Sequence, residues 1–470
     1  MTYPYTLSLK KNVAVHTDGA DMILAGSDAK GMRLASPSPA QKNILANLTG
    51  GGLTEDQLVE AAHNDGQDTD LARCYYLMSI LKQKKWLCYT LAPAGQKLAT
   101  LEPVSDAFTL HDSPVQGYYR LSRFACLRRL DRETVLESPL GHGRLFLHHG
   151  PAAALVALLA EPHSAADLAY TLPFAEAPDI EAFINLLQSA GALFPCDGEG
   201  RIAEDESLPL RQWEFHDLLF HSRSRAGRHD NVQGGAFPFL GEIPSLPGLK
   251  PHMSDKRIAL YQPAAAELEA MGCDFFSVIN ARRSLREQGT QPLSVKQLGI
   301  FLYCTGRIQQ HMPANPEQGH QYEASLRPCA AGGAIHEIEY YLTVSRCQGI
   351  EPGFYHYDPQ DHVMEHLGPL GTPQEHLLTD ARMSMGVKDC DLLITLTARF
   401  QRIAWKYRSL AYALIMKDVG SIYQQMYLVA TALNLAPCAL GRGNADHFAA
   451  ASGLDYYTES SVGEFVLSSR

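Results

Sequence analysis

The order of predicted elements in the N-terminal half constrains the fold of this chain most, because the same order occurs twice. In the first copy, residues 39–48 predict a short helix, and residues 54–57 form a capping box that begins a second helix. Residues 70–85 carry apolar side chains at helical spacing and predict a third helix. A β-hairpin is expected over about 86–101, so the first copy contains three helices and a wing.

The second copy keeps this order. Residues 151–159 predict a helix, Ser164 begins another, and apolar residues over 180–187 mark a third before a strand that starts at Ala192. Two winged-helix-like modules, related as a diverged repeat, are therefore predicted. DNA binding is not expected, because residues 179–191 contain no lysine or arginine. Capture of a peptide as an added strand fits better, and a spacer that stabilises a dimer is the alternative.

The length of the chain predicts several domains, since 470 residues exceed what one hydrophobic core usually holds. Glycine and proline crowd together between 234 and 251, which indicates a linker or an extended wrap across the next domain. We predict four segments: module 1 over 1–110, module 2 over 111–210, a linker over 211–253 and a catalytic domain over 254–470.

Composition excludes several classes of protein. A net charge of -11 argues against non-specific binding of nucleic acid. No apolar run approaches the roughly 18 to 20 residues that span a bilayer, and the first residues lack a signal peptide, so we expect a cytoplasmic protein. The cysteines lack zinc-type spacing, and His216 and His221 would lie on different faces of a helix, so no metal is expected.

The segment Arg282-Arg283-Ser284-Leu285-Arg286 is the first candidate for a binding site. Three guanidinium groups and a hydroxyl at the end of a helical stretch can donate several hydrogen bonds to a phosphate. Arginines at a helix end are also common on solvated surfaces. The pattern gains weight only from two segments further along the chain.

Arg282, Ser284 and Arg286 resemble the Arg-x-Ser-x-Arg pattern with which nitroreductase-fold enzymes bind the phosphate and ribityl chain of FMN. Downstream, residues 327–333 resemble the Arg-Pro-x-Pro-Ser-Gly-Gly stretch of the SagB-type dehydrogenases, which modify ribosomal peptides. Alanines stand at 330 and 331 where that family has Pro and Ser. The resemblance thus implies backbone contacts to the flavin ring, including one from Gly332, in place of a hydroxyl contact.

A third segment, residues 399–408, resembles the Lys-Tyr signature of azoline oxidases, which convert thiazolines or oxazolines to thiazoles or oxazoles. By this resemblance Lys406 and Tyr407 are the catalytic pair. Aromatising an azoline removes a proton and a hydride, so the site needs a base opposite the flavin. A cationic Lys406 would favour the Tyr407 phenolate, while burial would favour neutral lysine. The sequence leaves both assignments of the base open.

The last part of the chain predicts an α+β domain, with helices interleaved between antiparallel strands. Residues 414–435 predict a long helix that is apolar on nearly every face and therefore buried, which suits the central helix of a nitroreductase dimer. Leu440 and Gly441 match the family's position where backbone amides approach the flavin, and the closing residues 463–467 predict a strand.

With two front modules, the whole chain resembles the full-length oxidases of cyanobactin-type peptide pathways. That resemblance implies FMN, a homodimer with flavin at the subunit interface, oxygen as the electron acceptor and an azoline-containing precursor peptide as substrate. One alternative is an NAD(P)H-dependent nitroreductase or quinone reductase. Another is a non-catalytic peptide-binding scaffold subunit that keeps the fold for its shape.

Overall fold

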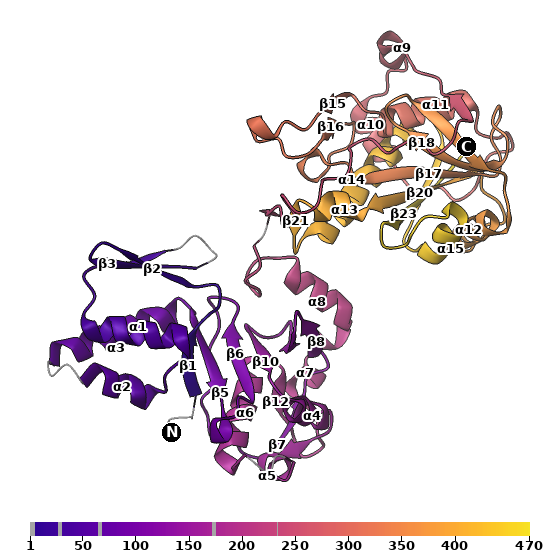
Figure 1. The fold of residues 1–470 in the computed structure, drawn as a ribbon. Coiled ribbons are helices and arrows are strands. Elements are labelled where there is room, and N and C mark those ends of the chain that lie inside the picture. The colour runs from indigo at the N-terminus through magenta and orange to yellow at the C-terminus, as the bar shows by residue number, and fades with distance from the viewer. Residues whose placement is uncertain (1–4, 27–30, 64–67, 172–174, 233) are drawn as a thin grey trace. The chain divides into compact units, whose positions relative to one another are not determined.

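The computed structural model of the protein describes residues 5–26, 31–63, 68–171, 175–232 and 234–470 (Figure 1). By its internal contacts the chain divides into two compact units, Met1–Val232 and Gln233–Arg470. Within the described ranges, no helix combines the length and apolar character needed to cross a membrane.

The first unit contains two three-helix groups with their strands. Its helices are α1 (Pro39–Gly50), α2 (Glu55–His63), α3 (Asp68–Gln83), α4 (Gly150–Leu158), α5 (Ala165–Ala169), α6 (Ala177–Ser189), α7 (Ala203–Glu206) and α8 (Phe215–Arg223). Its strands are β1 (Tyr5–Leu9), β2 (Ala14–Asp18), β3 (Asp21–Ala25), β4 (Met32–Leu34), β5 (Leu87–Leu91), β6 (Ala99–Pro103), β7 (Tyr118–Leu121), β8 (Cys126–Leu130), β9 (Glu133–Glu137), β10 (Gly143–Leu147), β11 (His163–Ser164) and β12 (Leu193–Pro195).

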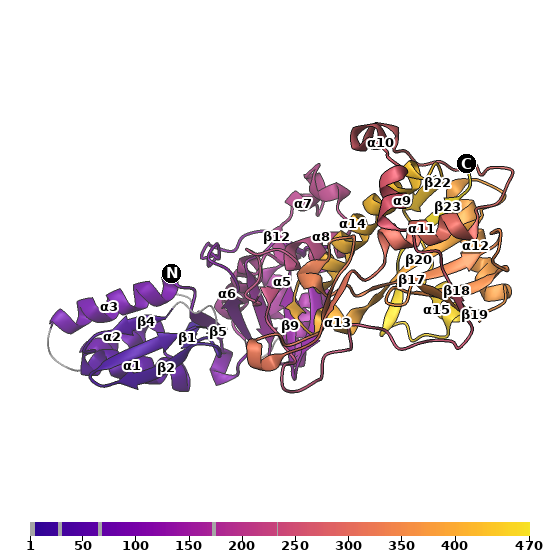
Figure 2. The ribbon, with the colours of Figure 1, turned by 90° about the horizontal axis from the view of Figure 1, so that it is seen from above.

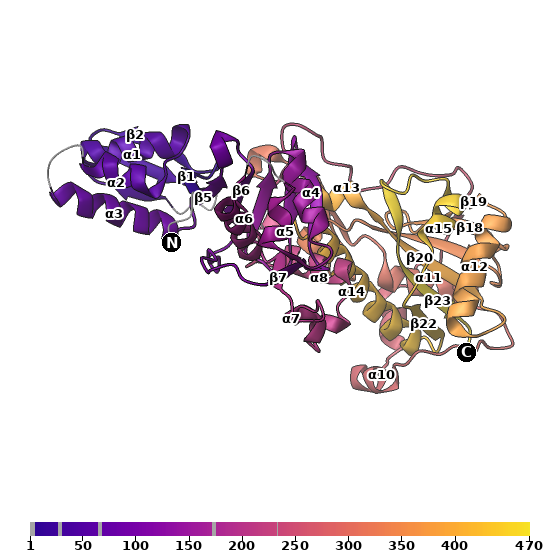
Figure 3. The ribbon, with the colours of Figure 1, turned by 90° about the horizontal axis from the view of Figure 1, so that it is seen from below.

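One sheet joins the two groups. Its six strands follow the order β1-β5-β6-β10-β9-β8, so the predicted hairpin β5–β6 of the first copy pairs directly with β10 of the second. Helices α1, α2 and α3 lie side by side in the views of Figures 2 and 3. A single core, which includes Leu45, Leu81, Leu101 and Phe183, runs through both groups. The two modules are thus one packed body.

The second unit holds a seven-stranded antiparallel sheet with helices on both faces. Its helices are α9 (Ala265–Ala270), α10 (Phe275–Ala281), α11 (Val295–Thr305), α12 (Thr372–Met385), α13 (Phe400–Ala404), α14 (Ala411–Ala432) and α15 (Ala445–Ser452). Its strands are β13 (Gly234–Gly235), β14 (Arg257–Ala259), β15 (Gln310–Met312), β16 (Ala324–Leu326), β17 (Ile338–Val344), β18 (Gly353–Asp358), β19 (Val363–Gly368), β20 (Leu392–Arg399), β21 (Tyr407–Arg408), β22 (Ala436–Leu440) and β23 (Glu459–Ser468).

The large sheet has the order β14-β19-β18-β17-β20-β23-β22. Because successive side chains of a strand point to opposite faces, β20 contributes to two cores. Leu392 and Ile394 join the core beneath α11 and α14, whereas Leu393 joins the core beneath α12 and α15. The two helix layers on either side of the sheet are visible in Figure 1. This arrangement confirms the predicted α+β class.

Several local predictions are confirmed by hydrogen bonds. Gln57 N donates to Thr54 Oγ1 at 3.2 Å, while Thr54 N donates to Gln57 Oε1 at 3.0 Å, which completes the expected capping box. The predicted closing strand is β23, which pairs with β20.

Within the single chain, the long helix is buried on one side and exposed on the other. Helix α14 packs one side against α11, β22 and β23, where Ile422 and Met426 are buried. Its other side keeps Tyr412, Lys417 and Gln424 exposed. Burial of that other side in a dimer stays a prediction.

Candidate active site

Lys406 lies just after α13, and Tyr407 is the first residue of the short strand β21. Strand β21 pairs with β13, with Gly235 opposite Tyr407, and the carbonyl of Lys406 accepts a hydrogen bond of 3.0 Å from the amide of Phe237. The backbone of the candidate pair is therefore held by the segment 234–237, which opens the second unit.

The ammonium of Lys406 contacts the hydroxyl of Tyr322, a residue that the sequence analysis does not single out. The Tyr322 hydroxyl in turn donates to the carbonyl of Gly333 at 2.9 Å. Burial lowers the pKa of Lys406, but hydrogen bonds and charge from Tyr322 and Tyr407 outweigh it, so the pKa is raised. Lys406 is therefore a cation in this arrangement.

The loop around Gly333 passes directly over this cation. Gly333 has a φ of 64°, and a Cβ there would lie 2.5 Å from Lys406 Nζ and 2.6 Å from Tyr407 Oη. The positive φ favours glycine at this position, and a Cβ there would displace the ends of the Lys406 and Tyr407 side chains. The neighbouring amide of Gly332 donates to Asp418 at 3.0 Å, so this predicted flavin-contacting group already has a partner in the chain.

The predicted phosphate-binding residues follow α10. Arg282 caps the helix, and its guanidinium lies 5.1 Å from the centroid of the Tyr427 ring. The hydroxyls of Ser284 and Tyr427 are 2.7 Å apart. Arg283 and Arg286 are exposed. Among the described residues, none of these arginines forms an ion pair, so their charges are available to an anion.

Strand β22 runs beside this basic cluster. The amide of Leu285 donates to the carbonyl of Pro437 at 2.9 Å, and Ala439 N donates to the Tyr427 hydroxyl at 2.9 Å. Leu440 at the end of β22 is buried in the core under α12 and α15, while Gly441 is exposed. Helix α14 thus carries a contact to the arginine segment through Tyr427 and a contact to the glycine loop through Asp418.

A second acidic residue lies beneath the glycine loop. Glu337 is fully buried, and its carboxyl group interacts with that of Asp418. Burial raises the pKa of Glu337 to about 8, and the charge of Asp418 adds to this. Burial also raises the pKa of Asp418. The amide of Gly332 thus donates a hydrogen bond to the carboxyl group of Asp418, and burial favours the protonated form of that group.

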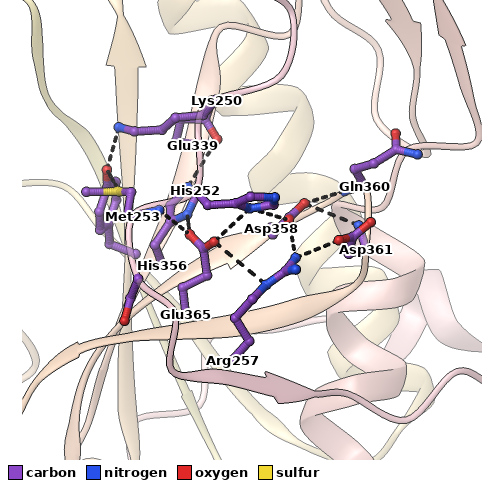
Figure 4. A network of polar contacts seen from close by, with 12 residues as sticks. Lys250, His252, Met253, Arg257, Glu339, His356, Asp358, Gln360, Asp361 and Glu365 are labelled. Atoms are coloured by element: carbon purple, nitrogen blue, oxygen red, sulfur yellow. Dashed lines mark hydrogen bonds and ion pairs between the residues drawn. The ribbon is translucent and has the colours of Figure 1, made fainter.

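A separate network of hydrogen bonds and ion pairs links β14 to the rest of the sheet (Figure 4). Ligand-type atoms of His252, Asp358 and Glu365 lie within 4.8 Å of one another, a spacing that could suit a metal. Arg257, however, donates to Asp358 at 2.9 Å, and His356 lies 2.9 Å from Glu365. The carboxylates are balanced by cationic groups of the chain itself, which makes this a structural network.

Three family models match the chain in sequence order. The helix-turn-helix domain of cyanobactin oxidase ThcOx matches residues 1–111, cyanobactin oxidase ThcOx matches residues 119–230, and the nitroreductase family matches residues 279–465. The chain is a nitroreductase-family protein of the cyanobactin oxidase type. This family membership confirms the resemblance drawn from Arg282, Lys406 and Tyr407, while the roles of those residues stay predictions.

Individual relatives match this cyanobactin oxidase-type protein over part of its length. A nitroreductase of Methanocaldococcus jannaschii is 26% identical over 165 residues, which is 35% of this chain and 76% of the relative. The trifolitoxin-processing protein TfxB of Rhizobium leguminosarum bv. trifolii is 30% identical over 109 residues, or 22% of this chain and 29% of that protein.

Solved structures similar to the cyanobactin oxidase-type chain have low sequence identity. A nitroreductase of Anabaena variabilis is 14% identical and covers 87% of this chain and 91% of its own, with a TM-score of 0.37. A nitroreductase of Ralstonia eutropha is 20% identical. The match covers 48% of this chain and 97% of that chain, with a TM-score of 0.35. A chain of the E. coli microcin synthetase McbBCD complex with truncated pro-MccB17 bound is 19% identical. The match covers 47% of this chain and 88% of that chain, with a TM-score of 0.32.

Proposed function

We propose that the protein oxidises thiazolines or oxazolines of a ribosomal peptide to thiazoles or oxazoles, with FMN as cofactor and oxygen as electron acceptor. The observation that carries the proposal is the enclosure of Lys406 and Tyr407 under the Gly333 loop. A reductase with this fold needs no proton acceptor fixed beside the Gly333 loop. Dehydrogenation of a ring carbon needs such an acceptor, because a proton leaves the ring.

The residues present fit FMN. Arg282, Ser284 and Arg286 supply donors and unpaired positive charge for a phosphate. Bound there, FMN would accept the hydride from the azoline.

The residues of the chain itself then have to accept the proton that leaves the azoline ring. We propose that the Tyr407 oxygen, once it has given up its own proton, accepts the ring proton, and that the cationic Lys406 stabilises the negative charge which this role requires. Lys406 Nζ lies 4.9 Å from the centroid of the Tyr407 ring, so the two side chains are direct neighbours. Of the two possible bases, the tyrosine is therefore our choice.

The deciding experiment is mass spectrometry of a thiazoline-containing peptide incubated in air with the purified protein, whose visible spectrum is recorded. We expect bound flavin and a loss of about 2 Da per ring. Lys406→Ala and Tyr407→Phe should keep the flavin and lose most turnover, while Lys388→Ala and Tyr76→Phe, at exposed positions, serve as controls. Flavin without mass change would favour the reductase, and absent flavin the scaffold.

We propose also that the protein is a homodimer. Helix α10 and its neighbourhood expose Met271, Phe275, Phe276 and Ile279, with Phe276 71% exposed, and such an apolar group beside a binding segment marks an interface. Sedimentation should give a dimer that Phe276→Glu weakens. A wild-type monomer would refute this proposal.

The precursor peptide is the partner that we propose for the front unit. A groove of about 450 Å³ between α2 and α3 is lined by apolar residues that include Leu58, Leu71 and Met78. A fluorescent precursor peptide should bind the protein, and Met78→Glu should weaken that binding. Equal binding by both proteins would exclude the groove.

A further inference from the structure

Tyr322 lies between β15 and β16, in a segment without any recognisable motif. Its hydroxyl contacts the Lys406 ammonium and donates its proton to the Gly333 carbonyl at 2.9 Å. An oxygen that donates its one proton to a carbonyl must accept from its other partner. The chain from Lys406 through Tyr322 to Gly333 therefore has one direction, and Lys406 is its donor.

Tyr322 contacts Lys406 through its aromatic ring as well as through its hydroxyl group. Lys406 Nζ lies 4.5 Å from the centroid of the Tyr322 ring and 4.9 Å from that of Tyr407, distances at which an aromatic face attracts a cation. The Tyr322 ring is itself backed by Phe237, with centroids 6.3 Å apart. The ammonium is thus enclosed by two phenol rings below a glycine loop.

We propose that Tyr322 is a positioning residue for the oxidation: its hydroxyl holds the Lys406 ammonium beside the Tyr407 hydroxyl and ties both to the Gly333 loop. This inference rests on the proposed function, because it assigns a task within that reaction. Tyr322 itself takes no proton from the substrate, since its own proton is committed to the Gly333 carbonyl.

The proposal has a consequence for pH. The titratable groups that act on Lys406 are Tyr322 and Tyr407, and together they outweigh the lowering effect of burial on its pKa. Removing the Tyr322 hydroxyl removes one of the effects that raise the pKa of Lys406. The lowering effect of burial is then less fully opposed, so this pKa falls. The cation beside the Tyr407 hydroxyl is then lost at a lower pH.

The test is Tyr322→Phe in the full-length protein, with Tyr76→Phe as the matched control. We expect unchanged flavin content, turnover reduced roughly 10-fold to 100-fold, and an alkaline limb of the kcat profile moved to lower pH. Unchanged turnover would overturn the proposal. Reduced turnover with an unmoved alkaline limb would overturn it too, because a merely structural role predicts that result.

A second measurement needs no activity. The rate at which Lys406 is acylated by an amine-reactive reagent, followed by mass spectrometry across pH, reports the pKa of its amine in wild type and Tyr322→Phe. A lower midpoint in the variant supports the proposal, and an equal midpoint overturns it. If the wild type oxidises no azoline while the midpoint still shifts, the proposed function fails but the hold of Tyr322 on Lys406 stands.

Discussion

Arg282 is a single side chain on which cofactor binding can be tested. Its guanidinium stacks on Tyr427 without a carboxylate partner among the described residues, so its charge is free for a phosphate. Arg282→Ala should lower flavin affinity about 10-fold or more, measured by flavin fluorescence during titration. Arg129→Ala, an exposed arginine of β8, is the control. Full flavin content in Arg282→Ala would remove this role.

Glu337 gives a prediction about pH and stability. Its pKa is raised from 4.5 to about 8 in the folded protein, so between these values the folded state holds a proton that the unfolded chain has lost. The free energy of unfolding should therefore fall as pH rises through this window. Glu337→Gln should flatten that fall, measured by urea denaturation at several pH values.

The control for this pH dependence is Glu351→Gln, at an exposed position, which should keep the wild-type slope. An equally steep fall in Glu337→Gln would show that another group titrates.

At this scale the sequence reveals only residues that lie in motifs. Lys406 and Tyr407 were predicted because residues 399–408 resemble the Lys-Tyr signature of azoline oxidases. Tyr322 and Asp418 could not be found, because one is a lone tyrosine in an irregular segment and the other a lone acid in an apolar helix. Their importance comes from long-range contacts with Lys406 and Gly332.

Among the elements, the segment 236–248 is the one with the clearest effect on the site. Besides the amide of Phe237, it supplies the carbonyl of Ile243 to the Trp405 indole at 2.6 Å and the carbonyl of Leu246 to Arg402 at 2.8 Å. We call this segment the strap. Its glycine and proline content predicted a linker or a wrap, and these contacts show a wrap along α13.

Phe237→Ala should loosen the strap. The ring packs against Trp405, with centroids 5.6 Å apart, and against Tyr322. We expect a loss of about 1–2 kcal/mol in the free energy of unfolding and reduced turnover with flavin still bound, measured by denaturation and by the peptide assay. Phe239→Ala, two positions along and 37% exposed, is the matched control. Equal effects of both changes would contradict the special position of Phe237.

The regular elements differ in how far the sequence predicts them. Capping boxes at Thr54 and Ser294 define α2 and α11 from local residues alone. Strands β7 to β10 were not predicted, because their side chains alternate weakly and β8 is an exposed edge with the pattern Cys-Leu-Arg-Arg-Leu. Pairing of β10 with β6 is a tertiary effect that periodicity does not encode.

For the whole molecule, the separate cores predict how it unfolds. One core lies entirely within Met1–Val232, and the other two lie within Gln233–Arg470. Calorimetry should therefore show two transitions. Added FMN should raise the midpoint of the transition that belongs to the second unit, because the proposed ligands all lie there. A single transition that shifts as a whole would contradict this independence.

The strap also has a consequence for exchanging parts between related proteins. The residues that follow the division at Val232 belong, by their contacts, to the Lys406 segment and not to the modules before them. A chimera joined near residue 250 would import a foreign strap against the native Trp405 and Arg402. A junction just before Gly234 keeps strap and catalytic segment from one parent, so front units could be grafted without disturbing the chemistry.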